Sequence, residues 1–118
     1  MHTLKLAVTT LVVLLTVLVL HLQGIEYHLY MSYWYYDIIT HFLGGVGIAL
    51  SVFFVLKNPR YIIPLTIVAG IIWELFEIYY NITGSKIWSN PYYIDTIKDL
   101  FNDTLGSVFV YLLIKYKK

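Results

Sequence analysis

Four long stretches of the chain are dominated by apolar residues, and shorter polar segments separate them. Each stretch is about long enough to cross a hydrocarbon core of roughly 30 Å as an α-helix. The sequence therefore predicts an all-α fold: an integral membrane four-helix bundle with short loops, built as one domain from residues 1–118. The expected spans cover about residues 4–22, 37–56, 61–81 and 92–115.

The segments between these stretches carry the signals that stop and start helices. Lys57-Asn-Pro-Arg60 predicts a short turn, because its proline cannot continue a helix. A polar segment follows the third stretch, and its Ser89-Asn-Pro91 end is typical of a helix start. Tyrosine and tryptophan gather in residues 27–36 and 88–93. Such rings favour the boundary between lipid and water, so both groups indicate a membrane interface.

The first stretch has a second interpretation, as a cleaved signal peptide, because Lys5 gives it a basic start. Its apolar run is longer than the usual signal core of about 7–15 residues. His21-Leu-Gln-Gly24 is also a poor cleavage site, since small residues are preferred there. We therefore expect a retained first helix.

Composition supports the membrane prediction and excludes several functions. The chain is 59% hydrophobic with a mean hydropathy of +0.72, which is too apolar for a soluble domain of 118 residues. A net charge of +1 without a basic run argues against a nucleic-acid partner. The absence of cysteine excludes a disulfide, a thiolate metal site and a cysteine nucleophile.

The basic residues predict an orientation. Cytoplasmic loops of membrane proteins are enriched in lysine and arginine. With a cytoplasmic N-terminus, four spans leave only Lys86 and Lys98 on the outer side. The chain is then N-in/C-in, a multi-pass protein of the cell (inner) membrane, with these residues inside: Lys5, Lys57, Arg60, Lys115, Lys117 and Lys118.

Six of the seven acidic residues fall in three short motifs, one in each of the last three stretches. Spacings of three and four place the members of each motif on one helix face. At about 1.5 Å per residue, the motifs lie roughly 18–30 Å from the inner basic residues. We therefore expect one polar layer in the outer third of the membrane, open to the extracytoplasmic face. The motifs are Asp37 with His41, Glu74 with Glu77, and Asp95 with Asp99 and Asp103.

Such a layer of acids must be neutralised. A charged acid costs about 2.5–3.5 kcal/mol at the bilayer centre, so six isolated acids are not credible. A cation, protonation, a water-filled cavity or pairing with Lys98 could neutralise them, and one lysine is too few. Carboxylates with one imidazole suit Mg, Mn, Zn, Ca or Fe, and can bridge two ions. We therefore predict a divalent metal ion held by Asp37, His41, Glu74, Glu77, Asp95, Asp99 and Asp103.

The motifs also have plain structural interpretations. Asp95 could complement the dipole at a helix N-terminus. Glu74 and Glu77 could hydrogen-bond a neighbouring helix, on a stripe with Gly70 and Asn81 that faces protein. His41 alone would be an ordinary buried histidine. Small residues at Gly44, Gly45 and Gly47 predict a close backbone approach rather than a phosphate loop. The remaining histidines are expected at the interface or in water: His2, His21 and His28.

Taken in order, the three motifs resemble those of a family of small bacterial and archaeal inner-membrane proteins typified by YjdF, and more distantly those of VanZ-like proteins. The resemblance covers roughly residues 37–107 and rests on Asp37-x-x-x-His41-Phe-x-Gly-Gly45, Trp73-Glu74-x-x-Glu77 and Asp95-Thr-x-x-Asp99-x-x-x-Asp103-Thr-Leu-Gly106. It implies a polytopic helical protein and brings no established reaction.

Three functions are compatible with these patterns. The first is a metal-dependent hydrolase or transferase acting on lipid-linked substrates, with His41 or a carboxylate as base and Lys98 as a second candidate for the chemistry. The second is a cation or proton transporter or sensor that uses the same acids. The third is a structural membrane assembly factor. Membrane lipids are the expected partners, and a homo-oligomer could complete the site.

Overall fold

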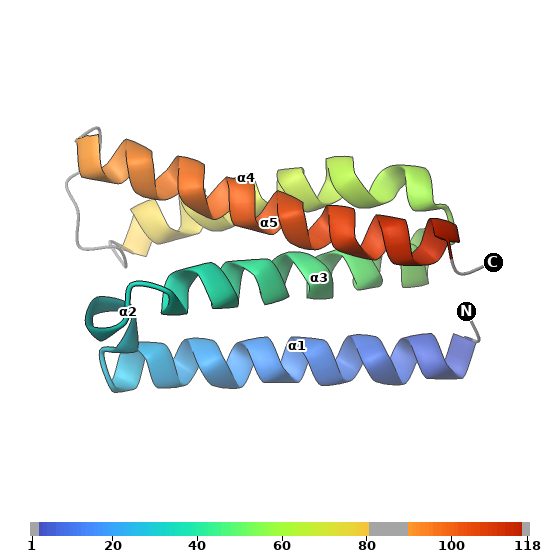
Figure 1. The fold of residues 1–118 in the computed structure, drawn as a ribbon, viewed down its shortest axis with the longest axis horizontal. Helices are drawn as coiled ribbons and strands as arrows, with labels where there is room; N and C mark the ends of the chain where they lie inside the picture. The colour runs from blue at the N-terminus through green and yellow to red at the C-terminus, as the bar shows by residue number, and fades with distance from the viewer. Residues whose placement is uncertain (1–2, 81–89, 117–118) are drawn as a thin grey trace.

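The computed structural model describes residues 3–80 and 90–116 of the chain, all in helices or the short turns between them. Four long helices run back and forth along one axis (Figure 1). The fold is therefore all-α and compatible with a four-helix bundle, as the apolar pattern predicted. The elements are α1 (Thr3–Glu26), α2 (Leu29–Ser32), α3 (Tyr36–Leu56), η1 (Pro59–Tyr61), α4 (Ile62–Tyr80) and α5 (Asn90–Tyr116).

Helix α3 is central to the bundle. It lies beside α1 on one side and beside α4 and α5 on the other (Figure 1). The α1 backbone approaches only α2 and α3 among the described helices. The start of α1 and the end of α5 lie at the same end of the bundle, which we call the η1 end, and α2 lies at the opposite, α2 end.

The helix boundaries agree with the sequence pattern except near α2. Helix α1 continues to Glu26, four residues beyond the apolar run, and stops before His28, whose φ of 56° is left-handed. The four-residue helix α2 follows, and the spacing of apolar residues did not predict it. Asn58 caps η1 by accepting a hydrogen bond from the Arg60 amide at 3.1 Å, so the turn before α4 forms as expected.

Three helical stretches are long and apolar enough to cross a membrane, among the described residues: Thr3–Glu26, Tyr36–Leu56 and Pro59–Glu77. The fourth long helix, α5, carries Lys98, Asp99 and Asp103 in its first half, and its longest apolar stretch follows. It nevertheless packs against both α3 and α4. Helix α5 therefore belongs to the bundle although its composition is mixed.

The distribution of polarity is reversed relative to a water-soluble bundle. Leucine and valine side chains of α1 such as Leu11, Leu15 and Leu22 are more than half exposed, whereas Glu74, Asp99 and Asp103 are buried. A water-soluble protein would bury the leucine and valine side chains and expose the acids to water. Lipid accommodates this apolar exterior, so the helices suit a membrane.

The interior is apolar in the half of the bundle nearer the η1 end. Six buried side chains form this core: Leu6, Val46, Ala49, Leu50, Ile62 and Val110. Buried hydroxyls nearby donate hydrogen bonds to carbonyl oxygens of their own helices, at 2.7 Å for Thr10 and for Thr66. These hydroxyls therefore need no polar partner on another helix.

Helices α3 and α5 touch backbone to backbone at Gly45 and Gly106. A Cβ on Gly45 would lie 2.9 Å from the carbonyl carbon of Asp103, and one on Gly106 would lie 2.8 Å from the Val46 nitrogen. Gly44, by contrast, faces open space. The expected close approach is therefore confirmed at Gly45, and it sets how near the polar residues of α3 and α5 can come.

A buried carboxylate and histidine cluster

Three helices bring six of the predicted residues together in the half of the bundle nearer the α2 end. Helix α3 supplies two of them from its first turns, α4 supplies two from its last turns, and α5 supplies two from its first half. The prediction that the three motifs converge is therefore confirmed. We call this group the acidic cluster: Asp37, His41, Glu74, Glu77, Asp99 and Asp103.

His41 lies between three carboxylates. Its Nδ1 atom is 3.0 Å from Oδ1 of Asp103, and its Nε2 atom is 3.3 Å from Oδ1 of Asp37 and 3.4 Å from Oδ2 of Asp99. The Gly45 contact explains this placement, because His41 lies one turn before the point where α3 meets α5. Both ring nitrogens therefore face acids, and the imidazole links α3 to α5.

A second group of carboxylates lies beside the first. Glu74, Glu77 and Asp99 each offer an oxygen, and these oxygens lie within 4.8 Å of one another. One ligand atom from each of Asp37, His41 and Asp99 meets the same limit. Asp99 is common to both groups and is 1% exposed. Ligand atoms on opposite sides of a metal ion, each about 2.0–2.4 Å away, are themselves about 4–5 Å apart. Both groups therefore have spacings that fit a divalent cation.

The predicted stripe on α4 faces the protein interior as expected at its three described residues, whereas Asn81 lies outside the described part of the chain. Gly70, Glu74 and Glu77 are all buried. Gly70 leaves room for α5, since a Cβ there would lie 2.8 Å from Oδ2 of Asp103. Glu77 accepts a hydrogen bond of 2.7 Å from the Trp73 indole. Helix α4 therefore contributes its acids through a close fit against α5.

Positive charge is scarce around this cluster. Lys98 is paired with Asp37, the distance from Nζ to Oδ2 being 3.5 Å. The other described lysines and arginine lie near the η1 end of the bundle: Lys5, Lys57, Arg60 and Lys115. Among the described residues, five carboxylates therefore share one imidazole and one ammonium group, and ionised acids would outnumber these cations.

Asp95 is the predicted residue whose position can be described only in part. It lies in α5, four residues before Asp99. Its side chain is outside the part of the chain that the structure describes. Its role as a ligand or as a helix-dipole acid stays a prediction.

Two residues that the sequence motifs did not single out, His21 and Tyr30, border the cluster together with Trp73 of the second motif. Tyr30 of α2 lies 2.9 Å from Nδ1 of His21, and the His21 ring meets the Trp73 ring edge-on at 5.3 Å. Burial raises the pKa of Tyr30 to about 12, outweighing a hydrogen bond with Thr40. Tyr30 therefore stays a neutral phenol.

His21 is half-buried rather than surrounded by water, because its ring packs between α2 and α4, and its expected place at the membrane interface stays a prediction. His28 is exposed, as expected, and His2 is outside the described residues. Only Trp73 carried a usable sequence signal, its spacing of four from Glu77. The contact of His21 with Tyr30 depends on the turn into α2, which residue spacing does not specify.

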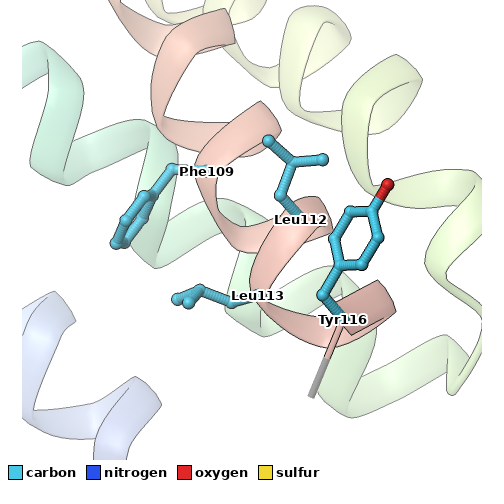
Figure 2. A pocket seen from close by; sticks show the side chains of 4 residues that line it. All are labelled: Phe109, Leu112, Leu113 and Tyr116. Carbon is cyan, nitrogen blue, oxygen red and sulfur yellow. The ribbon is translucent and has the colours of Figure 1, made fainter. Parts of the chain in front are cut away.

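The hollow in Figure 2 has a different character. It lies on the last turns of α5, toward the η1 end, and is lined by Phe109, Leu112, Leu113 and Tyr116. Its lining is apolar except for the Tyr116 hydroxyl. This surface offers no set of acids and bases comparable to the acidic cluster.

The fold and cluster define a helical membrane protein that buries a histidine among carboxylates from three helices. The chain belongs to a family described as predicted membrane protein (DUF2238), whose sequence model matches residues 1–118. No curated protein and no solved structure shows significant similarity to it. Membership in this family does not bear on the resemblance to YjdF or to VanZ-like proteins, which stays a prediction.

Proposed function

We propose that this protein binds one or two divalent metal ions in the acidic cluster, at the extracytoplasmic face of the cell (inner) membrane. The observation that carries the proposal is the placement of His41: its Nε2 atom faces Asp37 and Asp99, while Nδ1 faces Asp103. Histidines that bind metals commonly use one ring nitrogen as ligand and donate the other N–H to a carboxylate. The arrangement matches that pattern.

Residues from three helices would hold the metal. Asp37, His41 and Asp99 form one set of donors, and Glu74, Glu77 and Asp99 form the other. Asp103 would orient the imidazole rather than bind the ion. Oxygen with one nitrogen suits Mg, Mn, Zn, Ca or Fe, and a divalent charge would offset the excess of buried carboxylates.

We propose further that the bound metal serves a hydrolase or transferase that acts on a group carried by a membrane lipid. A divalent ion would polarise an ester bond and favour the attacking form of water. A carboxylate of the cluster would accept the proton, because His41 has no free ring nitrogen once Nε2 binds the ion and Nδ1 donates to Asp103. Burial of Glu74, Glu77, Asp99 and Asp103 keeps bulk water away, which strengthens these electrostatic effects.

The competing function, a cation or proton transporter, finds less support. A transporter needs a polar path to the opposite face. The η1 half of the described bundle instead buries the six apolar side chains of its core, and its hydroxyls bond to their own helices. Such a core offers no continuous set of polar groups within one chain, although an oligomer could build one between subunits.

Elemental analysis of protein purified in mild detergent without chelator tests the metal site. We expect about one or two equivalents of a divalent metal, lost when Asp99 and Glu74 are both changed to alanine. His41→Ala should lower the metal content more than His28→Asn, the control, because His28 is exposed and its left-handed backbone tolerates asparagine. Protein without metal, even after soaking with Mg, Mn, Zn and Ca, would contradict the proposal.

A further inference from the structure

Lys98 occupies a particular position at the edge of the acidic cluster. Its side chain is 42% exposed, whereas that of its partner Asp37 is 19% exposed. The other carboxylate oxygen of Asp37 lies 3.3 Å from Nε2 of His41. Asp37 is therefore shared between a largely buried imidazole and an ammonium group that reaches the outside.

A metal ion in the cluster would weaken the pair that Lys98 makes. Asp37 is one of the donors proposed to hold the ion, so its negative charge would be largely offset by the ion's two positive charges. The ammonium group of Lys98 would then be attracted less by Asp37 and repelled by the ion. The flexible four-carbon stem of lysine allows the group to turn toward the exposed side without moving α5.

We propose that, in the metal-loaded protein, Lys98 leaves Asp37 and binds the phosphate of a phosphomonoester lipid that reaches the cluster. The proposal rests on the proposed metal site and specifies its substrate class. A phosphate monoester carries up to two negative charges, which an ammonium group and a divalent ion together stabilise. A neutral acyl ester would gain much less from Lys98.

The surface around Lys98 favours a lipid as the carrier of this phosphate. Ile94, Ile97 and Phe101 flank Lys98 on α5 at spacings of one to four residues, and each is more than 60% exposed. In a membrane such side chains face acyl chains. An amphiphile could therefore place its tails along these residues while its phosphate meets the ammonium group.

The test measures ligand binding and metal content on the same samples. Detergent-purified protein, loaded with the metal found by elemental analysis, is titrated calorimetrically with short-chain phosphatidic acid, short-chain phosphatidylcholine and inorganic phosphate. The variants are Lys98→Gln, Lys98→Arg and Lys115→Gln. Lys115 is a matched control, because it lies on the same helix at the opposite end and is exposed.

We expect Lys98→Gln to weaken phosphatidic acid binding about tenfold, the loss of roughly one charged contact. Its metal content should stay unchanged, which also shows that the variant is folded. Lys98→Arg should keep most of the affinity, and Lys115→Gln should match the parent protein. Removing the metal from the parent protein should weaken binding at least as much as Lys98→Gln.

Equal affinity of Lys98→Gln and the parent protein, with metal present in both, would overturn this inference and leave the metal site intact. Phosphatidic acid binding that is as tight without metal would also overturn it, because release of Lys98 would then not depend on the ion. Inorganic phosphate that binds as tightly as phosphatidic acid would contradict a lipid carrier. Protein that never binds metal would overturn the proposed function, and this inference with it.

Discussion

The two halves of the bundle are built from the same long helices, yet they bury opposite kinds of side chain. Near the η1 end, the interior is apolar and hydroxyls such as that of Thr66 bond within their own helix. Near the α2 end, carboxylates from three helices face one another and His41. Packing alone can hold the first half together, whereas the second half needs its charges balanced.

The junction between the halves should be the most sensitive point. Gly45→Ala would push a methyl group into the backbone of Asp103, so we expect a loss of about 3 kcal/mol in the free energy of unfolding, the upper range for overpacking. Gly44→Ala is the matched control, because it faces open space and should be neutral or slightly stabilising. Denaturant unfolding in detergent measures both.

Similar stabilities for these two alanine variants would mean that α3 and α5 can separate at no cost. The backbone contact would then not define the site.

The second prediction concerns the half that holds the acids. A saturating divalent metal at about 100 times its dissociation constant should stabilise the parent protein by about 2.7 kcal/mol. Asp99→Asn should abolish this metal-dependent stabilisation, because Asp99 belongs to both donor groups. Glu26→Gln is the control, since Glu26 is exposed and lies outside the three motifs. Thermal unfolding with and without metal measures the difference.

A metal-dependent stabilisation that persists in Asp99→Asn would show that the two donor groups do not share this ligand.

The third prediction separates a ligand from a residue that orients one. Asp103→Asn should weaken metal affinity by about 10- to 100-fold without abolishing binding, the usual cost of losing the carboxylate behind a metal-bound histidine. The reason is that Asp103 faces Nδ1 of His41, on the opposite side of the ring from Nε2. Competition with a chelator of known affinity measures the change. Complete loss of binding would make Asp103 a direct ligand instead.

The smallest effect is expected in the apolar half. Thr66→Val keeps the shape of the side chain and removes a hydroxyl that donates its hydrogen bond to the Ile62 carbonyl of its own helix. The change in the free energy of unfolding should stay below about 1 kcal/mol, and metal content should not change. A larger loss would indicate that the apolar half also depends on polar contacts between helices.

Much of this comparison could be predicted from sequence, because periodicity and depth are local properties. The spacing of Asp37 and His41, and that of Asp99 and Asp103, fixed which side chains share a helix face. Lengths of apolar runs then placed these motifs at one depth. The cluster of α3, α4 and α5 residues followed from those two quantities.

The remaining features depend on contacts between helices, which the spacing of residues along the sequence does not predict. The rotation of α3 against α5 decides which nitrogen of His41 faces Asp103. That rotation depends in turn on the contact at Gly45 and Gly106. The approach of His21 to Tyr30 and Trp73 depends on the left-handed turn at His28. Neither a hydrophobic period nor a charge count carries this information.

The glycine contact between α3 and α5 also has an entropic consequence. A glycine has no side-chain rotamers to order on folding, so the junction fixes the separation of the two helices without a side-chain entropy cost. The spacing of His41 and Asp103 is then set largely by backbone geometry. A ligand that enters such a site meets donors that are already held in place, and less of its binding free energy is lost to ordering them.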